Sequence, residues 1–147
     1  YKTSLDHKKV EKRQVKSKYI PEVKVNRLNN NDFNKILKAG CEEATYEDII
    51  FDKYRNVYYR FACPQTEVDS KDSYLEITRY GKKLFTIVIL DKDLNIIGEK
   101  LFPEFTYVPT AHLIRKDGLY ISCSHFKNPN YSDDVLCFQK IKLIINL

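Results

Sequence analysis

The residues best spaced for chemistry lie in the segment Asp91-Lys92-Asp93-Leu94-Asn95. Its three oxygen-bearing side chains alternate, a spacing that lets the ligands of a calcium loop converge on one ion. A complete loop also needs a glycine at its sixth position, which is absent, and a carboxylate at its twelfth, which is Phe102. The same residue types favour a tight turn between strands, because Asp and Asn side chains bond their own backbone. We therefore predict a hairpin turn here and no metal site.

The histidines complete no metal or catalytic motif. His7, His112 and His125 are far apart, and no two of them have the spacing of a zinc site. The sequence also contains no Cys-x-x-Cys pair, no Gly-x-Ser-x-Gly elbow and no phosphate-binding glycine loop. It therefore predicts no catalytic residue, no metal and no cofactor.

The cysteines allow two interpretations. Cys63 and Cys123 end equivalent predicted strands, which favours small buried side chains. Cys123 and Cys137, however, lie on adjacent strands of the last predicted hairpin. A disulfide forms there if their Cα atoms come within about 7 Å of each other.

The positive charge is concentrated at one end of the chain. Lysine and arginine number 25 and aspartate and glutamate 20, for a formal net charge of +5. Residues 1–27 hold nine of the basic and three of the acidic side chains, a net of +6, so residues 28–147 carry −1. No aromatic residue interleaves these lysines as a base-stacking surface requires, so we favour an exposed strand edge over nucleic-acid binding. No apolar run approaches the roughly 18 residues of a membrane span.

Strand patterns dominate the elements that must position these side chains. Alternating apolar and polar residues, rich in β-branched and aromatic types and bounded by turn residues, predict strands. The predicted strands cover residues 49–51, 57–63, 74–79, 84–91, 96–102, 112–115, 119–124 and 135–145. A single stretch favours a helix, because Asn31 is a suitable cap, an apolar face follows and Gly40 marks an end.

The strands repeat, and the repeat predicts the architecture. Residues 4–23 and 89–105 both contain a strand, Leu-Asp, a polar turn, a second strand and Pro-Glu. Residues 49–63 and 112–123 match each other in the same way. Sequential four-stranded antiparallel units of this kind are the blades of a β-propeller. We therefore predict an all-β chain with one short helix, the C-terminal two-blade part of a propeller, with a small β-sandwich as the alternative.

The predicted organisation has four parts. Residues 1–27 are a basic hairpin that ends a preceding blade, and 28–46 are a short helix and a connection. Residues 47–109 are a full blade, and 110–147 are a last, incomplete blade. A propeller needs about four to eight blades to close its ring. The chain also begins at Tyr1 and contains no methionine, so we expect it to be part of a longer protein.

Function is expected in the loops, since loops carry binding residues on a rigid scaffold. In a propeller the loops 64–73, 103–110 and 125–133 share one face. We predict that a ligand or protein partner contacts four side chains projecting from that face: Tyr107, His125, Tyr131 and Asp69. Tyrosine suits such contacts, because its ring is rigid and its hydroxyl is polar.

The block Asp52–Phe61, Asp-Lys-Tyr-Arg-Asn-Val-Tyr-Tyr-Arg-Phe, resembles the domain-of-unknown-function family 4221, lipoproteins of Bacteroides-type bacteria with propeller-like repeats. The strand Leu84–Leu90 and the hairpin Ile121–Lys140 are similar to that family's C-terminal half, and the resemblance extends from about Tyr19 onward. It implies an outer-membrane surface location and a lipid anchor upstream of Tyr1, although the signal and the anchoring cysteine are absent here. It implies no known activity.

The expected function is therefore that of a non-enzymatic module of a surface lipoprotein. It would bind a nutrient or dock on an outer-membrane transporter as an accessory subunit, and it would meet the membrane only through the upstream anchor. The alternative is a propeller enzyme, a hydrolase or lyase, whose site is mostly contributed by blades outside these residues.

Overall fold

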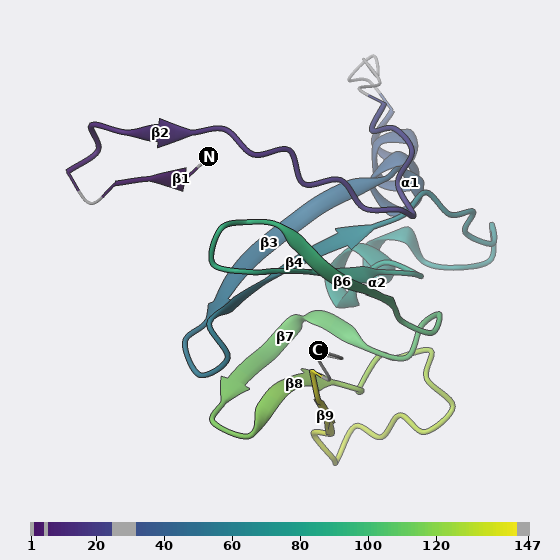
Figure 1. Ribbon diagram of the computed structural model, residues 1–147. Coiled ribbons are helices and arrows are strands. Elements are labelled where there is room, and N and C mark those ends of the chain that lie inside the picture. Colours follow the sequence, from purple (N-terminus) through teal and green to yellow (C-terminus); the bar gives the residue numbers. More distant parts are fainter. Residues whose placement is uncertain (1, 5, 25–31, 144–147) are drawn as a thin grey trace.

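The structure is a computed structural model that describes residues 2–4, 6–24 and 32–143 (Figure 1). Most of the regular structure in this part is strand, and the pairing is antiparallel throughout. Its elements are β1 (Lys2–Thr3), β2 (Val10–Glu11), α1 (Phe33–Glu42), β3 (Thr45–Asp52), β4 (Val57–Cys63), α2 (Tyr74–Tyr80), β5 (Thr86–Leu90), β6 (Ile96–Leu101), β7 (Val108–Arg115), β8 (Gly118–Ser122) and β9 (Phe138–Ile141). They form sheets of two, four and three strands in sequence order: β1-β2, β3-β4-β5-β6 and β7-β8-β9. The prediction of a mainly β chain is confirmed.

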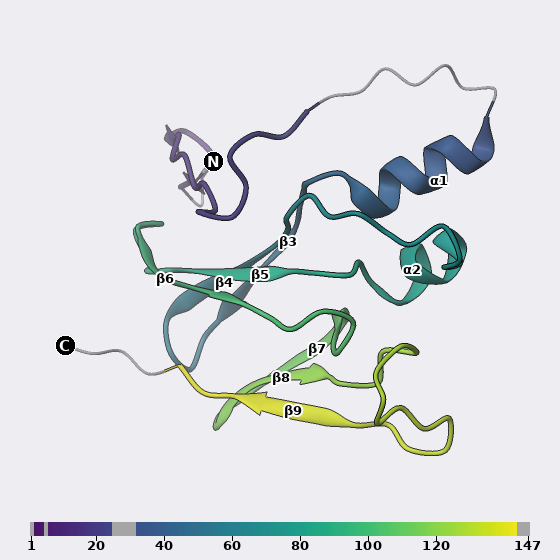
Figure 2. The ribbon, with the colours of Figure 1, turned by 90° about the vertical axis from the view of Figure 1, so that its right-hand side faces the viewer.

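The two larger sheets pack face to face and enclose the main core (Figure 2). Val57, Tyr59 and Phe61 alternate along β4 and all point into this core, as the period of a strand requires. Ile87 on β5 lies beside them on the same face of the sheet, and Ile121 on β8 belongs to the sheet opposite. Burial of these apolar side chains holds the two sheets together.

The other face of the four-stranded sheet is covered by the segment that follows the first hairpin. Glu99 on β6 accepts hydrogen bonds from Ser17 Oγ at 2.5 Å and from the backbone N–H of Lys18 at 2.9 Å. Ile20 is buried beside them, against Ala44 and Ala62. The hairpin β1–β2 itself reaches the β5–β6 turn.

Helix α1 is longer than predicted. Its cap is Asp32, whose side chain accepts a hydrogen bond from the backbone N–H of Lys35, and the predicted cap Asn31 lies outside the described residues. The prediction that Gly40 ends the helix is wrong, since α1 continues to Glu42. Cys41 lies in this extension, buried in an apolar cluster that includes residues of the 64–73 loop and α2. That packing outweighs the cost of a glycine inside a helix, which is about 1 kcal/mol.

The predicted strand 74–79 is helix α2, so the chain has two described helices instead of one. Ser73 caps it by accepting a hydrogen bond from the backbone N–H of Glu76, in the spacing of a capping box. The helix ends at Gly81, whose φ of 121° is open to glycine alone. None of the helices in the described part is long and apolar enough to cross a bilayer.

The last predicted strand, 135–145, is much shorter in the structure. Strand β9 covers Phe138–Ile141, while Val135 and Leu136 are exposed in the loop before it. Residues 144 and 145 lie outside the described part. Apolar residues at 135–136 suggested a longer strand, but β9 starts after Cys137, which is covalently tied to Cys123.

Candidate functional site

Three connections leave the same end of the two larger sheets (Figure 2). Strands reverse direction at every turn, so the connections β4–β5, β6–β7 and β8–β9 emerge together, beside both helices. We call residues 64–73, 102–107 and 123–137 the loop face. The turns β3–β4, β5–β6 and β7–β8 lie at the opposite end.

Side chains from the third connection hold the loop face together. Lys127 Nζ lies 2.5 Å from a carboxylate oxygen of Asp72 and 4.3 Å from the ring centre of Phe105, so it links all three connections. Asn128 Nδ2 donates hydrogen bonds to the carbonyl oxygens of Thr106, at 3.2 Å, and Cys123, at 2.8 Å. The loops are therefore fixed relative to one another and present a preformed surface.

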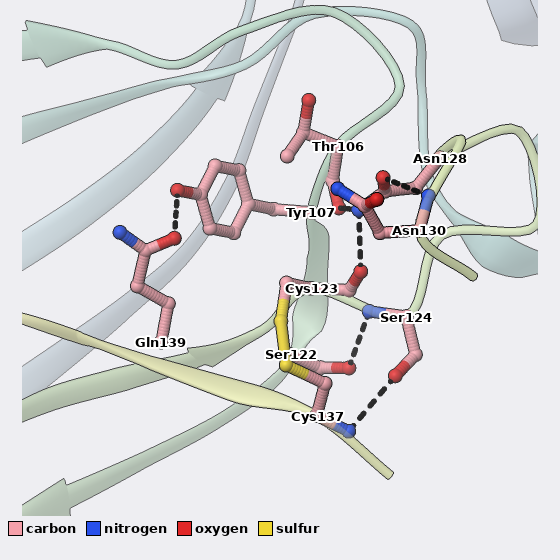
Figure 3. The surroundings of a disulfide bond; sticks show 9 residues. All are labelled: Thr106, Tyr107, Ser122, Cys123, Ser124, Asn128, Asn130, Cys137 and Gln139. Atoms are coloured by element: carbon pink, nitrogen blue, oxygen red, sulfur yellow. Dashed lines mark hydrogen bonds between the residues drawn. A yellow bond between two sulfur atoms is a disulfide. The ribbon is translucent and has the colours of Figure 1, made fainter. Parts of the chain in front are cut away.

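A disulfide closes the third connection (Figure 3). Cys123 and Cys137 are bonded, with their Cα atoms 5.4 Å apart. Ser124 Oγ accepts a hydrogen bond from the backbone N–H of Cys137 at 3.1 Å, beside the bridge. The interpretation of Cys123 as a free buried thiol is therefore wrong, whereas Cys63, like Cys41, is a buried free thiol.

The four predicted contact residues lie in different surroundings. Asp69 is exposed on the loop face and Tyr131 is partly exposed. Tyr107 does not project: its ring packs edge-on against Phe102, 5.4 Å away, and its hydroxyl donates to Gln139 Oε1 at 2.5 Å. His125 does not project either, because its side chain is buried within the loop face.

His125 is held neutral by its hydrogen bonds and its burial. Its Nδ1 accepts from the backbone N–H of Lys127 at 3.2 Å, so its Nε2 carries the proton and donates to the carbonyl oxygen of Gly81 at 3.2 Å. The ring of Phe126 stacks on it at 4.8 Å. Burial lowers the pKa of His125, and the nearby Lys127 charge acts in the same direction.

The buried His125 predicts a loss of stability in mild acid. Below about pH 6.5 the unfolded chain takes up a proton on this residue, while the folded protein resists it. Stability therefore falls as pH drops below that value, by at most about 1.4 kcal/mol per pH unit for one proton. Urea unfolding between about pH 7 and pH 5 measures this slope. The His125→Gln variant should have a flatter profile, and equal slopes in the two proteins would contradict the assignment.

Two aromatic side chains that the sequence analysis did not select, Tyr80 and Phe126, contact each other at this end of the sheets. The rings of Tyr80 and Phe126 lie 5.4 Å apart, and both are partly exposed. A hydrogen bond from the Tyr131 hydroxyl to Asp133, 2.5 Å long, raises the pKa of Tyr131, and Tyr80 is close enough to add to that shift. The sequence did not indicate that Tyr80 and Phe126 lie together, because their segments are far apart in the chain.

A cavity of about 230 Å³ lies beside β3 and β7, the first strands of the two larger sheets. The register of β3 shifts between Tyr46 and Ile49, and that of β7 shifts between Val108 and His112. Such bulges re-aim side chains and occur next to functional sites more often than elsewhere. The charged side chains in the cavity wall are Glu47, Asp48 and Lys82. His112 is engaged elsewhere, with its Nδ1 2.8 Å from the carbonyl oxygen of Pro109.

The segment with calcium-like spacing forms the β5–β6 turn. Asp91 accepts three hydrogen bonds within it: from the backbone N–H groups of Asp93 and Asn95, at 2.8 and 2.9 Å, and from Asn95 Nδ2 at 2.9 Å. The prediction of a hairpin turn is confirmed. Over the described ranges, no three His, Cys, Asp or Glu side chains gather closely enough to hold a metal ion.

Comparison with known proteins gives one family and one solved structure. The model of the family described as "Domain of unknown function (DUF4221)" matches residues 1–101. The chain is also similar to the crystal structure of a member of the DUF4221 family from Bacteroides vulgatus, with a sequence identity of 35% and a TM-score of 0.72. That match covers 84% of this chain but 34% of the other, so the chain spans about a third of that relative. No curated protein matches.

Proposed function

The chain belongs to the DUF4221 family, and we propose that it is a non-enzymatic binding or accessory module of a surface lipoprotein. In this proposal the two larger sheets are successive blades of a β-propeller, and the loop face carries the contacts. The module binds a nutrient or docks on an outer-membrane transporter. A lipid anchor upstream of Tyr1 attaches the protein to the outer membrane.

Burial on both faces of the four-stranded sheet supports the propeller. Ile87 on β5 faces the sheet β7–β9, while Val88 and Leu90 point to the opposite face and are completely buried there. In a two-sheet sandwich, the outer face of each sheet is polar and exposed to water. A blade instead lies between two neighbouring blades. The segment after the hairpin β1–β2 packs on the face of the four-stranded sheet opposite β7–β9, and in this proposal it belongs to the preceding blade (Figure 1).

The disulfide supports a location outside the cytosol. Disulfides such as Cys123–Cys137 form and persist in oxidising compartments, which in bacteria include the periplasm and the cell surface. The family resemblance implies the same location, and the similar crystal structure comes from a Bacteroides species.

The observation that carries the binding role is a set of three aromatic side chains, two on the loop face and one at the end of α2. Tyr80, Phe126 and Tyr131 are partly exposed side chains that come from two different connections. The Lys127–Asp72 ion pair and the disulfide hold those connections in place. Rigid aromatic rings on a fixed scaffold bind partners without a large entropy cost on ordering. The enzyme alternative is favoured only by the small cavity beside Glu47 and Asp48.

We expect the double variant Tyr80→Ala/Tyr131→Ala to bind its partner at least about tenfold more weakly, as truncation of aromatic hot-spot residues does. The measurement uses the full-length, lipid-anchored protein, with a pull-down from outer membranes and with glycan and peptide arrays. Tyr54→Ala is the matched control, because Tyr54 is 48% exposed but lies in the β3–β4 turn at the opposite end.

Recovery of a transporter, a glycan or a peptide that the double variant loses and Tyr54→Ala retains would support the proposal. The proposal fails if the membrane pull-down recovers no stable partner and the arrays give no binding. Cleavage of a bound glycan or peptide would support the enzyme alternative instead.

A further inference from the structure

The outer edge of the sheet β7–β8–β9 differs from that of its neighbour. The first large sheet has four strands, with β6 at its outer edge, whereas within the described residues the second has three. Strand β9 is therefore an edge strand. An edge strand carries a row of backbone N–H and C=O groups that can pair with another strand.

The hydrogen bond beside the disulfide shows which backbone groups of β9 have no strand partner within the described residues. The backbone N–H of Cys123 donates to the carbonyl oxygen of Cys137 at 2.9 Å, and their Cα separation of 5.4 Å is that of a hydrogen-bonded pair. Antiparallel pairs alternate, and Ser122 lies opposite Phe138. Phe138 and Lys140 therefore direct their backbone groups away from β8, toward the open edge.

A cavity of about 700 Å³ lies between the outer strands of the two sheets. Its apolar wall comes from both sheets and includes Ile87, Ile89, Ile97, Leu119 and Ile141. Gly98 on β6 pairs with Ile89, so it occupies the cavity-facing side of its strand without a side chain. A Cβ at that position would meet only Ile89 Cδ1, at 3.5 Å.

We propose that this edge and this cavity receive a β-strand of the same polypeptide from outside residues 1–147. The strand pairs with the free backbone groups of Phe138 and Lys140 and completes the sheet as its fourth strand. Its apolar residues, at alternate positions, enter the cavity, and one of them lies over Gly98. The proposal goes beyond the binding role of the loop face, and it holds whether the sheets belong to a propeller or to a sandwich.

Three observations favour this occupant over a small molecule or another protein. The neighbouring sheet already has four strands in simple sequence order. An open backbone edge and an apolar cavity lie side by side. An added strand uses both, because its backbone pairs with the edge and its alternate side chains fill the cavity, whereas a compact ligand uses the cavity alone. The similar crystal structure is of a much longer chain, of which these residues match 34%. The longer protein therefore has ample chain to supply a strand.

Amide hydrogen exchange of the full-length protein tests the pairing residue by residue. We expect the N–H groups of Phe138 and Lys140 to exchange as slowly as those of Gln139 and Ile141, at least about 100-fold slower than in an unstructured peptide. An alternating pattern, fast at Phe138 and Lys140 but slow at Gln139 and Ile141, would overturn the proposal.

Two variants of one residue separate the backbone from the side chain. Lys140→Pro removes the outward N–H but leaves the β8–β9 hydrogen bonds in place, since proline is tolerated on edge strands. We expect it to raise the exchange rate of Phe138 at least about tenfold in the full-length protein. Lys140→Ala loses the 2.7 Å ion pair with Asp117 but keeps the N–H, so it should leave that rate unchanged.

A variant on the other sheet keeps the test decisive if Lys140→Pro does not fold. Gly98→Leu fills the cavity from β6 and should displace the strand, which raises exchange at both Phe138 and Lys140. If Phe138 and Lys140 still exchange slowly in Gly98→Leu, the added strand does not place its side chains in the cavity, which contradicts the proposal. Protection that appears only after a second protein is added would show a partner's strand instead. Slow exchange of the amides that line the cavity, together with fast exchange at Phe138 and Lys140, would show a small ligand. Both of these results overturn the proposal.

Discussion

Replacing Asp52 by alanine is expected to remove about 3–5 kcal/mol of unfolding free energy, the range for taking one partner from a buried ion pair. The Asp52 side chain is completely buried at the end of β3. It accepts hydrogen bonds from the backbone N–H groups of Tyr54 and Arg55, at 3.0 and 3.2 Å, and from the Arg55 guanidinium. Urea unfolding followed by circular dichroism measures the loss.

The size of the expected effect comes from what Asp52 positions. The Arg55 guanidinium, oriented by Asp52, donates to the carbonyl oxygens of Arg115, at 2.9 Å, and Lys116, at 3.1 Å, in the β7–β8 turn. Burial raises the pKa of Tyr59 to about 12, so its hydroxyl stays protonated and donates to Asp52 at 3.1 Å. Asp52→Ala therefore takes the acceptor from four donors, the two backbone N–H groups, the Arg55 guanidinium and the Tyr59 hydroxyl, and it loosens the link between the two larger sheets.

Asp91→Ala is the matched control for Asp52→Ala. Asp91 also accepts three hydrogen bonds inside a hairpin turn, but it is partly exposed and makes no contact to the second sheet through an arginine. Its loss should be clearly smaller, because water replaces the missing hydrogen bonds. Equal losses in the two variants would mean that Asp52 acts only as a turn cap.

The strand order was predictable because local signals agree along most of the chain. Strand β4 covers 57–63 as predicted, since its alternation is strict and Pro64 follows it. The turns at 52–56, 91–95 and 116–118 contain the residues that such turns require. The repeat then indicated how many strands each sheet contains.

Helix α2 was missed because its composition and its cap disagree. Residues 74–79 include β-branched and aromatic types that favour strands, and they make the segment resemble its neighbours. The capping pair of Ser73 and Glu76 indicates a helix instead. Burial of Ile77 against the cluster that contains Cys41 and Val68 decides between the two.

The predicted site residues show where sequence reasoning stops. The loops were predicted to share one face, and contacts such as Lys127–Asp72 do join them. Whether a loop side chain points outward depends on contacts with distant segments. Tyr107 turns inward because Phe85 and Phe102 offer an apolar site, and His125 turns inward because the carbonyl oxygen of Gly81 accepts a hydrogen bond from its Nε2–H.

Replacing both Cys123 and Cys137 by alanine is expected to remove about 3 kcal/mol of unfolding free energy. The two residues are 14 positions apart, and a disulfide that closes a loop of about 15 residues stabilises by roughly that amount, because it restricts the unfolded chain. The loop it closes carries Lys127 and Asn128, whose contacts hold the loop face together. Urea unfolding under oxidising conditions gives the loss.

A reducing agent supplies the control, because it removes the same bond without a substitution. The unmodified protein should lose about 3 kcal/mol on reduction, and the double variant should lose nothing further. Cys63→Ala removes a buried free thiol on β4 and should leave the response to reduction intact. If reduction leaves the unmodified protein as stable as before, the bond contributes nothing, and the contacts of Lys127 and Asn128 alone hold the loop face.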